Sequence, residues 1–240
     1  MKHLSLRVAL LLIASHPAYA QQDDLISTER PSFSNTPYTM AAGRWQIESG
    51  YEYVNDDDGA DLEQHTLPQL LLRYGLSEDM ELQLAWPGFS RREAGGQSDD
   101  GIRDAAVAVK FGLRDETAGT PVAFLAGMTV PVGDDGFTSD DFEPFIGVSW
   151  VRAMFFGTAA ISKDDSDYDF DNGVGVRFAL RGDASVFAEW HATIPDDGDA
   201  VHRLNGGVLW LRRPNMQLDL HVGVGLNDRA ADYALGAGFS

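Results

Sequence analysis

From Arg44 to the end of the chain, apolar and polar residues alternate with a period of two. Between Arg44 and Tyr53, Trp45 and Ile47 fall on one face, and Gln46 falls on the other. Successive side chains of a β-strand point to opposite faces, so this pattern predicts strands. Such segments start near Arg44, Leu70, Met80, Val107, Val122, Phe142, Met154, Asn172, Ala184, Val201, Met216 and Asp232. Helical periodicity of useful length is absent from this region, and we predict an all-β fold of about 12 strands.

Two features indicate that the apolar face points outward. The opposite face is rich in glycine, which weakens strands and brings no benefit to a water-facing sheet, whereas the narrow interior of a barrel needs room. These glycines include Gly50, Gly112, Gly127, Gly147, Gly173, Gly175, Gly223, Gly225, Gly236 and Gly238. On the apolar face, aromatic residues such as Trp45, Tyr74 and Trp210 favour the strand ends, which suits the interfacial girdles of a membrane barrel.

The connections between strands alternate in length and charge. The long, acidic ones cover residues 55–64, 87–103, 131–141, 163–169, 193–200 and 227–231, and short turns lie at 77–79, 181–183 and 213–215. Long loops on one side and short turns on the other are typical of outer-membrane barrels, and an even strand number returns both termini to the turn side. We therefore predict a single antiparallel up-and-down transmembrane β-barrel over residues 44–240. A soluble exported β-sandwich is the less favoured alternative.

The first 43 residues divide into two segments. A signal peptide over residues 1–20 is predicted by Lys2 and Arg7, the apolar run 8–14 and the small residues around Tyr19. A buried N-terminal helix is the less favoured alternative, and the apolar run is too short to span a membrane. Residues 21–43 contain Pro31 and Pro37 without sustained alternation. We expect this periplasmic segment to fold against or into the barrel opening as a possible plug, or to remain a mobile tail.

Composition narrows the possible partners. The chain has 240 residues, no cysteine and a net charge of −19, and losing Lys2 and Arg7 with the signal peptide brings the mature chain to −21. Such a charge argues against a nucleic-acid partner. Without disulfides, an exported chain needs a fold that is stable by itself, as a large closed barrel is.

Several motifs carry a resemblance to a known family. They are residues 28–34 (TERPSFS), 42–50 (AGRWQIESG), 101–104 (GIRD), 130–134 (VPVGD) and 218–228. Together they resemble the MetA-pathway phenol-degradation family of transporter-like outer-membrane β-barrel proteins. The resemblance implies passage of aromatic or other small hydrophobic solutes, contact with outer-membrane lipid and lipopolysaccharide, and insertion by the barrel-assembly machinery. Such barrels commonly end on an aromatic residue that the machinery reads, whereas here Ser240 follows Phe239.

No catalytic, metal or cofactor site is predicted. No metalloprotease or nucleophile-elbow motif frames a histidine of the mature chain, so an outer-membrane hydrolase is a minor alternative. The acidic run 164–171 lacks the glycine and glutamate that an EF-hand requires. This favours a solvated loop over loose binding of Ca²⁺ or Mg²⁺ beside lipopolysaccharide.

The predicted inner face carries charges of both signs. Its candidate lumen-lining residues are Glu48, Glu52, Arg73, Glu81, Gln83, Lys110, Arg177, Glu189, His191, Asp219 and His221. Salt bridges among them would give a closed structural or binding barrel of the cell envelope. A solvated path would give a narrow channel or transporter for small solutes, which is the interpretation that we favour.

Overall fold

The computed structural model describes residues 25–57, 61–113, 119–164 and 167–240. The predicted signal peptide, residues 1–20, lies outside the described residues. Within the described part of the chain the regular structure is entirely β. None of the described residues forms a helix long and apolar enough to cross a membrane.

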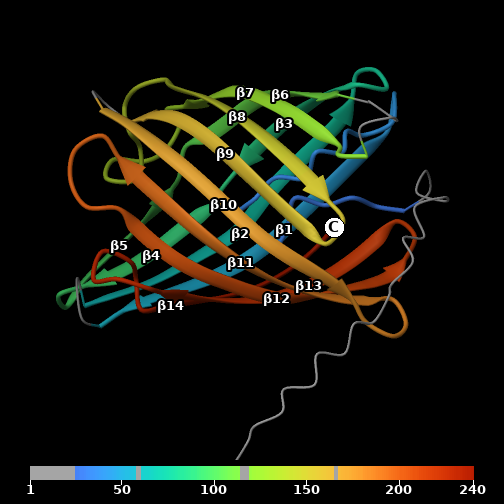
Figure 1. The fold of residues 1–240 in the computed structure, drawn as a ribbon. Helices are drawn as coiled ribbons and strands as arrows, with labels where there is room; N and C mark the ends of the chain where they lie inside the picture. Colours follow the sequence, from blue (N-terminus) through green and yellow to red (C-terminus); the bar gives the residue numbers. More distant parts are fainter. Residues whose placement is uncertain (1–24, 58–60, 114–118, 165–166) are drawn as a thin grey trace, which may run out of the picture.

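Figure 1 labels the strands in chain order. They are β1 (Trp45–Asp56), β2 (Leu62–Gly75), β3 (Met80–Trp86), β4 (Phe89–Ala94), β5 (Gln97–Ile102), β6 (Ala105–Leu113), β7 (Val122–Val130), β8 (Glu143–Arg152), β9 (Phe155–Asp164), β10 (Asp167–Ala179), β11 (Ala184–Pro195), β12 (Val201–Arg213), β13 (Met216–Gly225) and β14 (Tyr233–Phe239). Except for β3 with β4 and β5 with β6, strands that follow one another along the chain are antiparallel neighbours (Figure 1).

These segments make up twelve barrel strands, as predicted. One half of β2 pairs with β3 and the other half pairs with β4, so β3 and β4 are one strand interrupted at Pro87 and Gly88. Likewise, β5 pairs with β4 and β6 pairs with β3, so β5 and β6 form the next strand.

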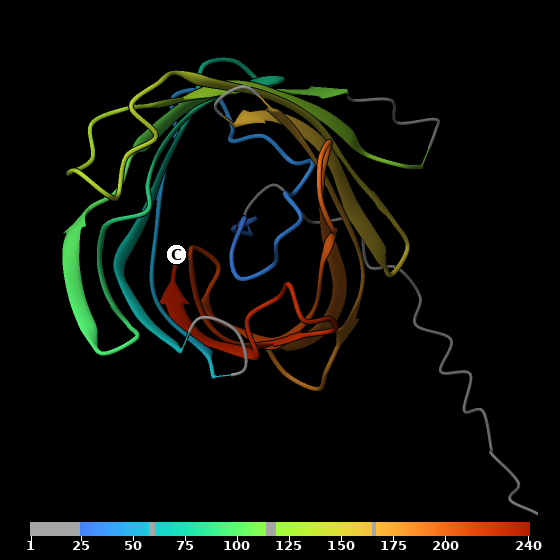
Figure 2. The same ribbon diagram turned by 90° about the vertical axis from the view of Figure 1, so that its left-hand side faces the viewer.

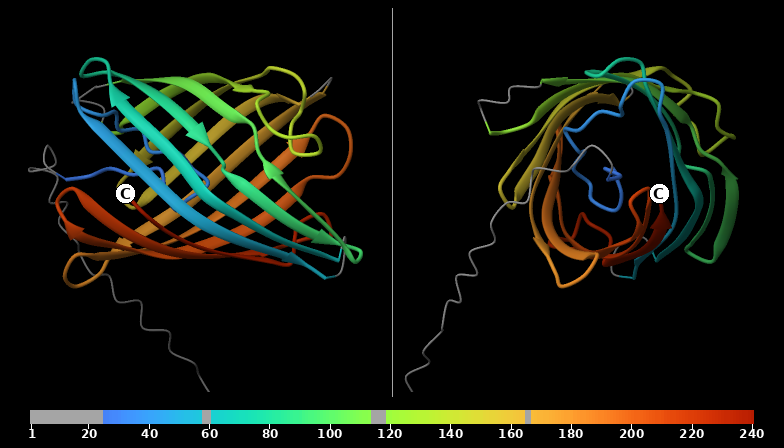
Figure 3. Two further views of the ribbon diagram at one scale, coloured as in Figure 1. Left: turned by 180° about the vertical axis from the view of Figure 1, so that it is seen from behind. Right: turned by 90° about the vertical axis from the view of Figure 1, so that its right-hand side faces the viewer.

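The sheet closes through β1, which pairs with both β2 and β14. The β1–β14 register runs from Ser49 opposite Phe239 to Asn55 opposite Tyr233. Apart from β5, which pairs only with β4, the strands have neighbours on both sides, so their backbone hydrogen bonds are satisfied without water, as a membrane requires. The tilted ring of strands is visible in Figures 2 and 3.

The two faces of the wall are the reverse of those in a soluble protein. Outward residues are apolar and exposed, as Leu220 and Ile146 show at 62% and 61%. The largest fully buried side chains are Arg73, Lys110, Glu48, Glu81 and Glu189. Phe156, Phe187 and Leu209, on β9, β11 and β12, form a small inward apolar cluster. The lipid-facing interpretation of the alternation is therefore correct.

The prediction of a loop over residues 87–103 is wrong. The chain there forms β4 and β5, joined by Gly95 and Gly96, whose φ angles are +55° and +76°. Two consecutive residues at positive φ are the signature of a tight hairpin turn that matches strand twist. A hairpin that extends beyond the lipid needs no apolar face. The alternation of apolar and polar residues therefore ends there, although the backbone hydrogen bonds between β4 and β5 continue.

The N-terminal segment, residues 25–43, forms no strand and runs inside the barrel (Figures 2 and 3). Thr28, Glu29 and Ser34 are buried there at 6%, 8% and 3% exposure. The chain enters at the end that carries the short turns, where Ile26 N donates to Pro214 O in the β12–β13 turn.

Candidate functional site

The inner wall binds the backbone of the N-terminal segment through carboxylates. Glu48 of β1 accepts hydrogen bonds from Glu29 N, at 3.1 Å, and Arg30 N, at 3.0 Å. Across the lumen, Glu189 of β11 accepts from Phe33 N and Ser34 N, each at 2.8 Å. An irregular segment has backbone N–H groups that need acceptors when buried, and the wall supplies them.

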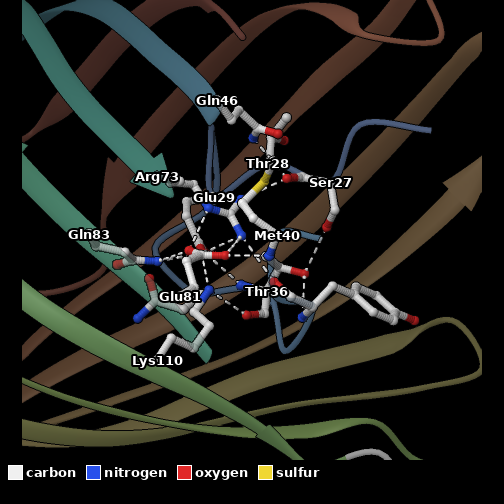
Figure 4. A network of polar contacts seen from close by, with 12 residues as sticks. Ser27, Thr28, Glu29, Thr36, Met40, Gln46, Arg73, Glu81, Gln83 and Lys110 are labelled. Atoms are coloured by element: carbon white, nitrogen blue, oxygen red, sulfur yellow. Dashed lines mark hydrogen bonds and ion pairs between the residues drawn. The ribbon is translucent and has the colours of Figure 1, made fainter. Parts of the chain in front are cut away.

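Arg73 of β2 is the centre of a buried ionic network (Figure 4). Its guanidinium donates to Glu81 at 2.7 and 2.9 Å and to Glu48 at 3.2 Å. It also donates to the carbonyl oxygens of Ser27, at 2.6 Å, and Tyr38, at 2.9 Å. Arg73 thus clamps two points of the segment while pairing with two acids of the wall, which compensates the cost of burying its charge.

Glu29 places a third carboxylate in this network. Lys110 of β6 pairs with Glu29, and Arg73 Nη2 lies 3.6 Å from Glu29 Oε1. Lys110 Nζ also donates to Thr36 O at 2.9 Å, and Gln83 donates to Glu29 at 3.2 Å. Three acids of the network, Glu29, Glu48 and Glu81, therefore face two cations, Arg73 and Lys110.

Arg30 occupies a slot whose walls are two glycines. Its guanidinium donates to Gln69 at 2.9 Å and to Asp219 at 3.3 Å. A Cβ atom added to Gly50 or Gly238 would overlap this guanidinium. The absence of side chains at these two wall positions is what admits Arg30.

The other predicted lumen residues lie around the Arg73 network and the Arg30 slot. Glu52 accepts from Gln69 at 3.2 Å, and His221 Nδ1 lies 3.3 Å from Asn205 Oδ1. His191 Nε2 lies 3.4 Å from Asp171 Oδ1, and its ring stacks on Phe33 with centroids 4.6 Å apart. Arg177 is exposed, with its guanidinium 5.4 Å from the centre of the Phe156 ring.

A pocket of about 570 Å³ lies on the loop side of the network. Ala85 and Ala106 belong to its wall, and they lie on β3 and β6 just beyond Gln83 and Ala108. The loop from 131 to 142 closes one side of this pocket. Asp104 fixes that loop by accepting five hydrogen bonds from Val132, Gly133, Thr138 and Ser139.

Sequence reasoning missed the segment's half of the site. Glu29, Arg30 and the carbonyl of Ser27 are partners of the wall charges, and on the wall Gln46, Asn205 and Gln217 also contact the segment. The signal available was an adjacent acid and base, Glu29 and Arg30, in a stretch without alternation. Pairing them with particular wall residues requires the three-dimensional path of the chain.

Comparison with known protein families assigns the chain to one of them. A family model described as "Putative MetA-pathway of phenol degradation" matches residues 28–240, which include the buried segment and the entire barrel. The chain belongs to this family. The resemblance noted in the sequence is thereby confirmed. Among curated proteins none matches the chain at a significant level.

Solved structures share the fold of this family member. An outer membrane channel from Pseudomonas putida F1 superposes with a TM-score of 0.68 at 14% identity, covering 87% of this chain and 98% of that one. The NanC porin superposes with a TM-score of 0.51 at 10% identity, covering 82% and 98%. At these identities the comparison establishes the outer-membrane barrel fold.

Proposed function

We propose that this protein is a narrow outer-membrane channel for small solutes, and that residues 25–43 plug its lumen from the periplasmic side. One observation carries the proposal: Glu48 of β1 and Glu189 of β11, four strands apart around the ring, each bind two consecutive backbone N–H groups of the segment. A wall built only to hold itself shut has no need of acids that accept from the backbone of another segment, yet Glu48 does so beside its pair with Arg73. Here they cap a separate piece of chain.

The bonds that hold the segment are of a kind that water can replace. Most are hydrogen bonds between wall side chains and its backbone. The wall pairs of Arg73 with Glu48 and Glu81 do not depend on the segment. If the segment left, water would solvate the exposed groups of a polar lumen. The closed barrel, whose ladder is independent of the segment, would persist.

Small aromatic compounds are the proposed solutes. The family description refers to phenol degradation, and the pocket on the loop side includes Phe137 and Phe145 in its wall. A narrow lumen excludes large polymers, because a barrel of this strand number has an interior between the filled eight-stranded and the open sixteen-stranded cases.

Deleting residues 21–40 from the mature protein tests the plug. We expect a higher single-channel conductance in planar bilayers, with the heat-dependent shift in electrophoretic mobility retained. Unchanged conductance through a folded barrel would reject the plug and favour the closed structural barrel.

A reversible tether tests the same proposal without removing any chain. A Cβ atom at Gly173 would lie 3.7 Å from the Cβ of Ser34, a separation that suits a disulfide. The chain has no cysteine of its own. We expect Ser34→Cys with Gly173→Cys to conduct poorly when oxidised and to recover on reduction. The single variant Ser34→Cys is the matched control and should not respond to reductant.

The contacts of the luminal histidines favour a role in packing over a role in catalysis. His191 stacks on Phe33 of the segment and His221 contacts Asn205, so both take part in packing of the plugged lumen. An assay of the purified protein with added esters or glycosides separates the two functions. A hydrolase would release product from them, whereas a channel would not.

A further inference from the structure

The pocket on the loop side of the network lies where a solute from outside would arrive first. Its wall is formed by inward positions of β2, β3, β4 and β6 to β10 together with the loop from 131 to 142. Ala106 of this wall lies on the same strand face as Lys110, which contacts the N-terminal segment. Its volume of about 570 Å³ falls in the range usual for small-molecule sites.

The pocket is held in shape by contacts that need no ligand. The five hydrogen bonds to Asp104 fix the loop that carries Phe137. Phe137 in turn packs over Gly101 of β5, where an added Cβ would lie 2.6 Å from the ring. Phe145 of β8 lies in the same way over Gly127 of β7. Rigid sites bind with a smaller loss of entropy.

The pocket combines aromatic surface with positive charge. Arg92 extends over Phe137, with its guanidinium carbon 5.1 Å from the ring centre, and pairs with Asp99 at 3.3 Å. Arg103 is exposed at the wall. Its charge acts on the luminal Glu52, yet among the described residues its guanidinium has no hydrogen bond or ion pair.

The acids of the pocket are already engaged. Asp104 is saturated by the loop, and Glu143 and Asp169 each have interactions of their own. These contacts occupy the acids, and the guanidinium of Arg103 is a cationic donor left for a ligand, although the mature chain is strongly acidic overall. A guanidinium recognises a carboxylate through paired, charge-assisted hydrogen bonds.

We infer that this pocket binds small aromatic carboxylates, with the ring against Phe137 and Phe145 and the carboxylate on Arg103. The inference rests on the proposed function in that the pocket lies on the solute path. Binding itself does not require conduction, so the two can fail separately.

Calorimetry on the detergent-solubilised mature protein tests this inference with benzoate as the probe. Phenol keeps the ring without the carboxylate, and cyclohexanecarboxylate keeps the charge without the aromatic ring. We expect benzoate to bind at least about tenfold more tightly than either, because each comparator loses one of the two interactions. Equal affinities for all three compounds, or no benzoate binding, would overturn the inference.

Variants locate the site. Arg103→Gln should weaken benzoate binding about tenfold, since a charge-assisted bond is lost. Phe137→Leu should weaken it as well and serves if Arg103→Gln does not fold. Arg212→Gln is the matched control, because Arg212 stacks on Trp210 beside the β12–β13 turn at the opposite end. Benzoate affinity that is unchanged in both folded pocket variants would contradict the assignment.

Discussion

Glycines on the inner wall are the residues that make room for the N-terminal segment. A Cβ at Gly173 would lie 2.5 Å from Ser34 Oγ, and one at Gly112 would lie 3.3 Å from Thr39 Cγ2. Gly50 and Gly238 leave the space that Arg30 fills. The sequence indicated that the interior needs room, and the structure identifies what occupies that room.

Gly50→Ala should loosen the plug without opening the barrel. The added methyl displaces the Arg30 guanidinium, the flexible end of a side chain, and separates it from Gln69 and Asp219. We expect higher conductance with normal heat-modifiability. Gly223→Ala is the control, because its Cβ would meet Ala234 at an ordinary 3.6 Å. Equal conductance in both variants would show that Arg30 does not hold the segment.

Asp104 gives the loop from 132 to 139 a defined dependence on pH. Burial by itself would raise the pKa of the Asp104 carboxyl, but hydrogen bonds from the 132–139 loop outweigh it and lower the pKa below its ordinary value. A lowered pKa means that the attachment is complete above about pH 4 and is lost only as the pH falls further. We expect benzoate affinity in Asp104→Asn to fall at neutral pH, measured by calorimetry. An unaltered affinity would mean that the loop does not shape the pocket.

At the scale of the strand, alternation of apolar and polar residues shows which part of a strand contacts lipid. It does not show how far the hydrogen-bonded strand extends. It located all twelve barrel strands, yet β2 begins at Leu62 and β10 at Asp167, earlier than the apolar pattern starts. β4 and β5 lie wholly outside that pattern. Backbone hydrogen bonding continues into water, where either face can be polar, so hydrophobic periodicity ends before the strand does.

Outward positions in the middle of strands should reject charge. Leu72, Val109 and Leu220 face outward from β2, β6 and β13. Arginine at any one should cost about 2 to 4 kcal/mol and impair assembly, measured by unfolding titrations in lipid vesicles. Leu226→Arg, placed just beyond β13, is the control and should cost about 1 kcal/mol or less near the interface. Neutral effects at all three mid-strand sites would be incompatible with the assigned faces.

At the scale of the whole molecule, closure of the sheet is what stabilises the chain without disulfides. Leu235 of β14 pairs with Tyr53 of β1 and with Val222 of β13, so it lies in the closing strand. Proline removes a ladder hydrogen bond and is confined to sheet edges, strand ends and bulges, and Leu235 lies at none of these.

The mature protein should fractionate with the outer membrane and migrate differently after heating. Leu235→Pro should abolish the heat-dependent shift, because the closing strand no longer pairs. Asp197→Pro, in the connection after β11, should keep it. Recovery of the wild-type protein in the soluble periplasm would refute the barrel assignment.

The sequence by itself determined the class of fold, the strand number and the faces of the alternating segments, though not those of β4 and β5. These are local properties, since period-two alternation reflects the solvent on each side of a strand. It also distinguished the segment before Arg44 from the barrel, because proline and broken alternation exclude a strand there. The inward positions of Arg73, Glu81 and Lys110 follow from the same parity.

Only the tertiary structure decided what those inward charges do. The bonds that Arg30 N donates to Glu48 and Ser34 N donates to Glu189 join residues 18 and 155 positions apart. Nothing local specifies such pairs, because they depend on where the closed wall places each acid and on the path of the segment within it. The same holds for the pocket, where Asp104 meets a loop about 30 residues further along the chain. Contacts across a lumen are consequences of closure, and closure is a property of the entire sheet.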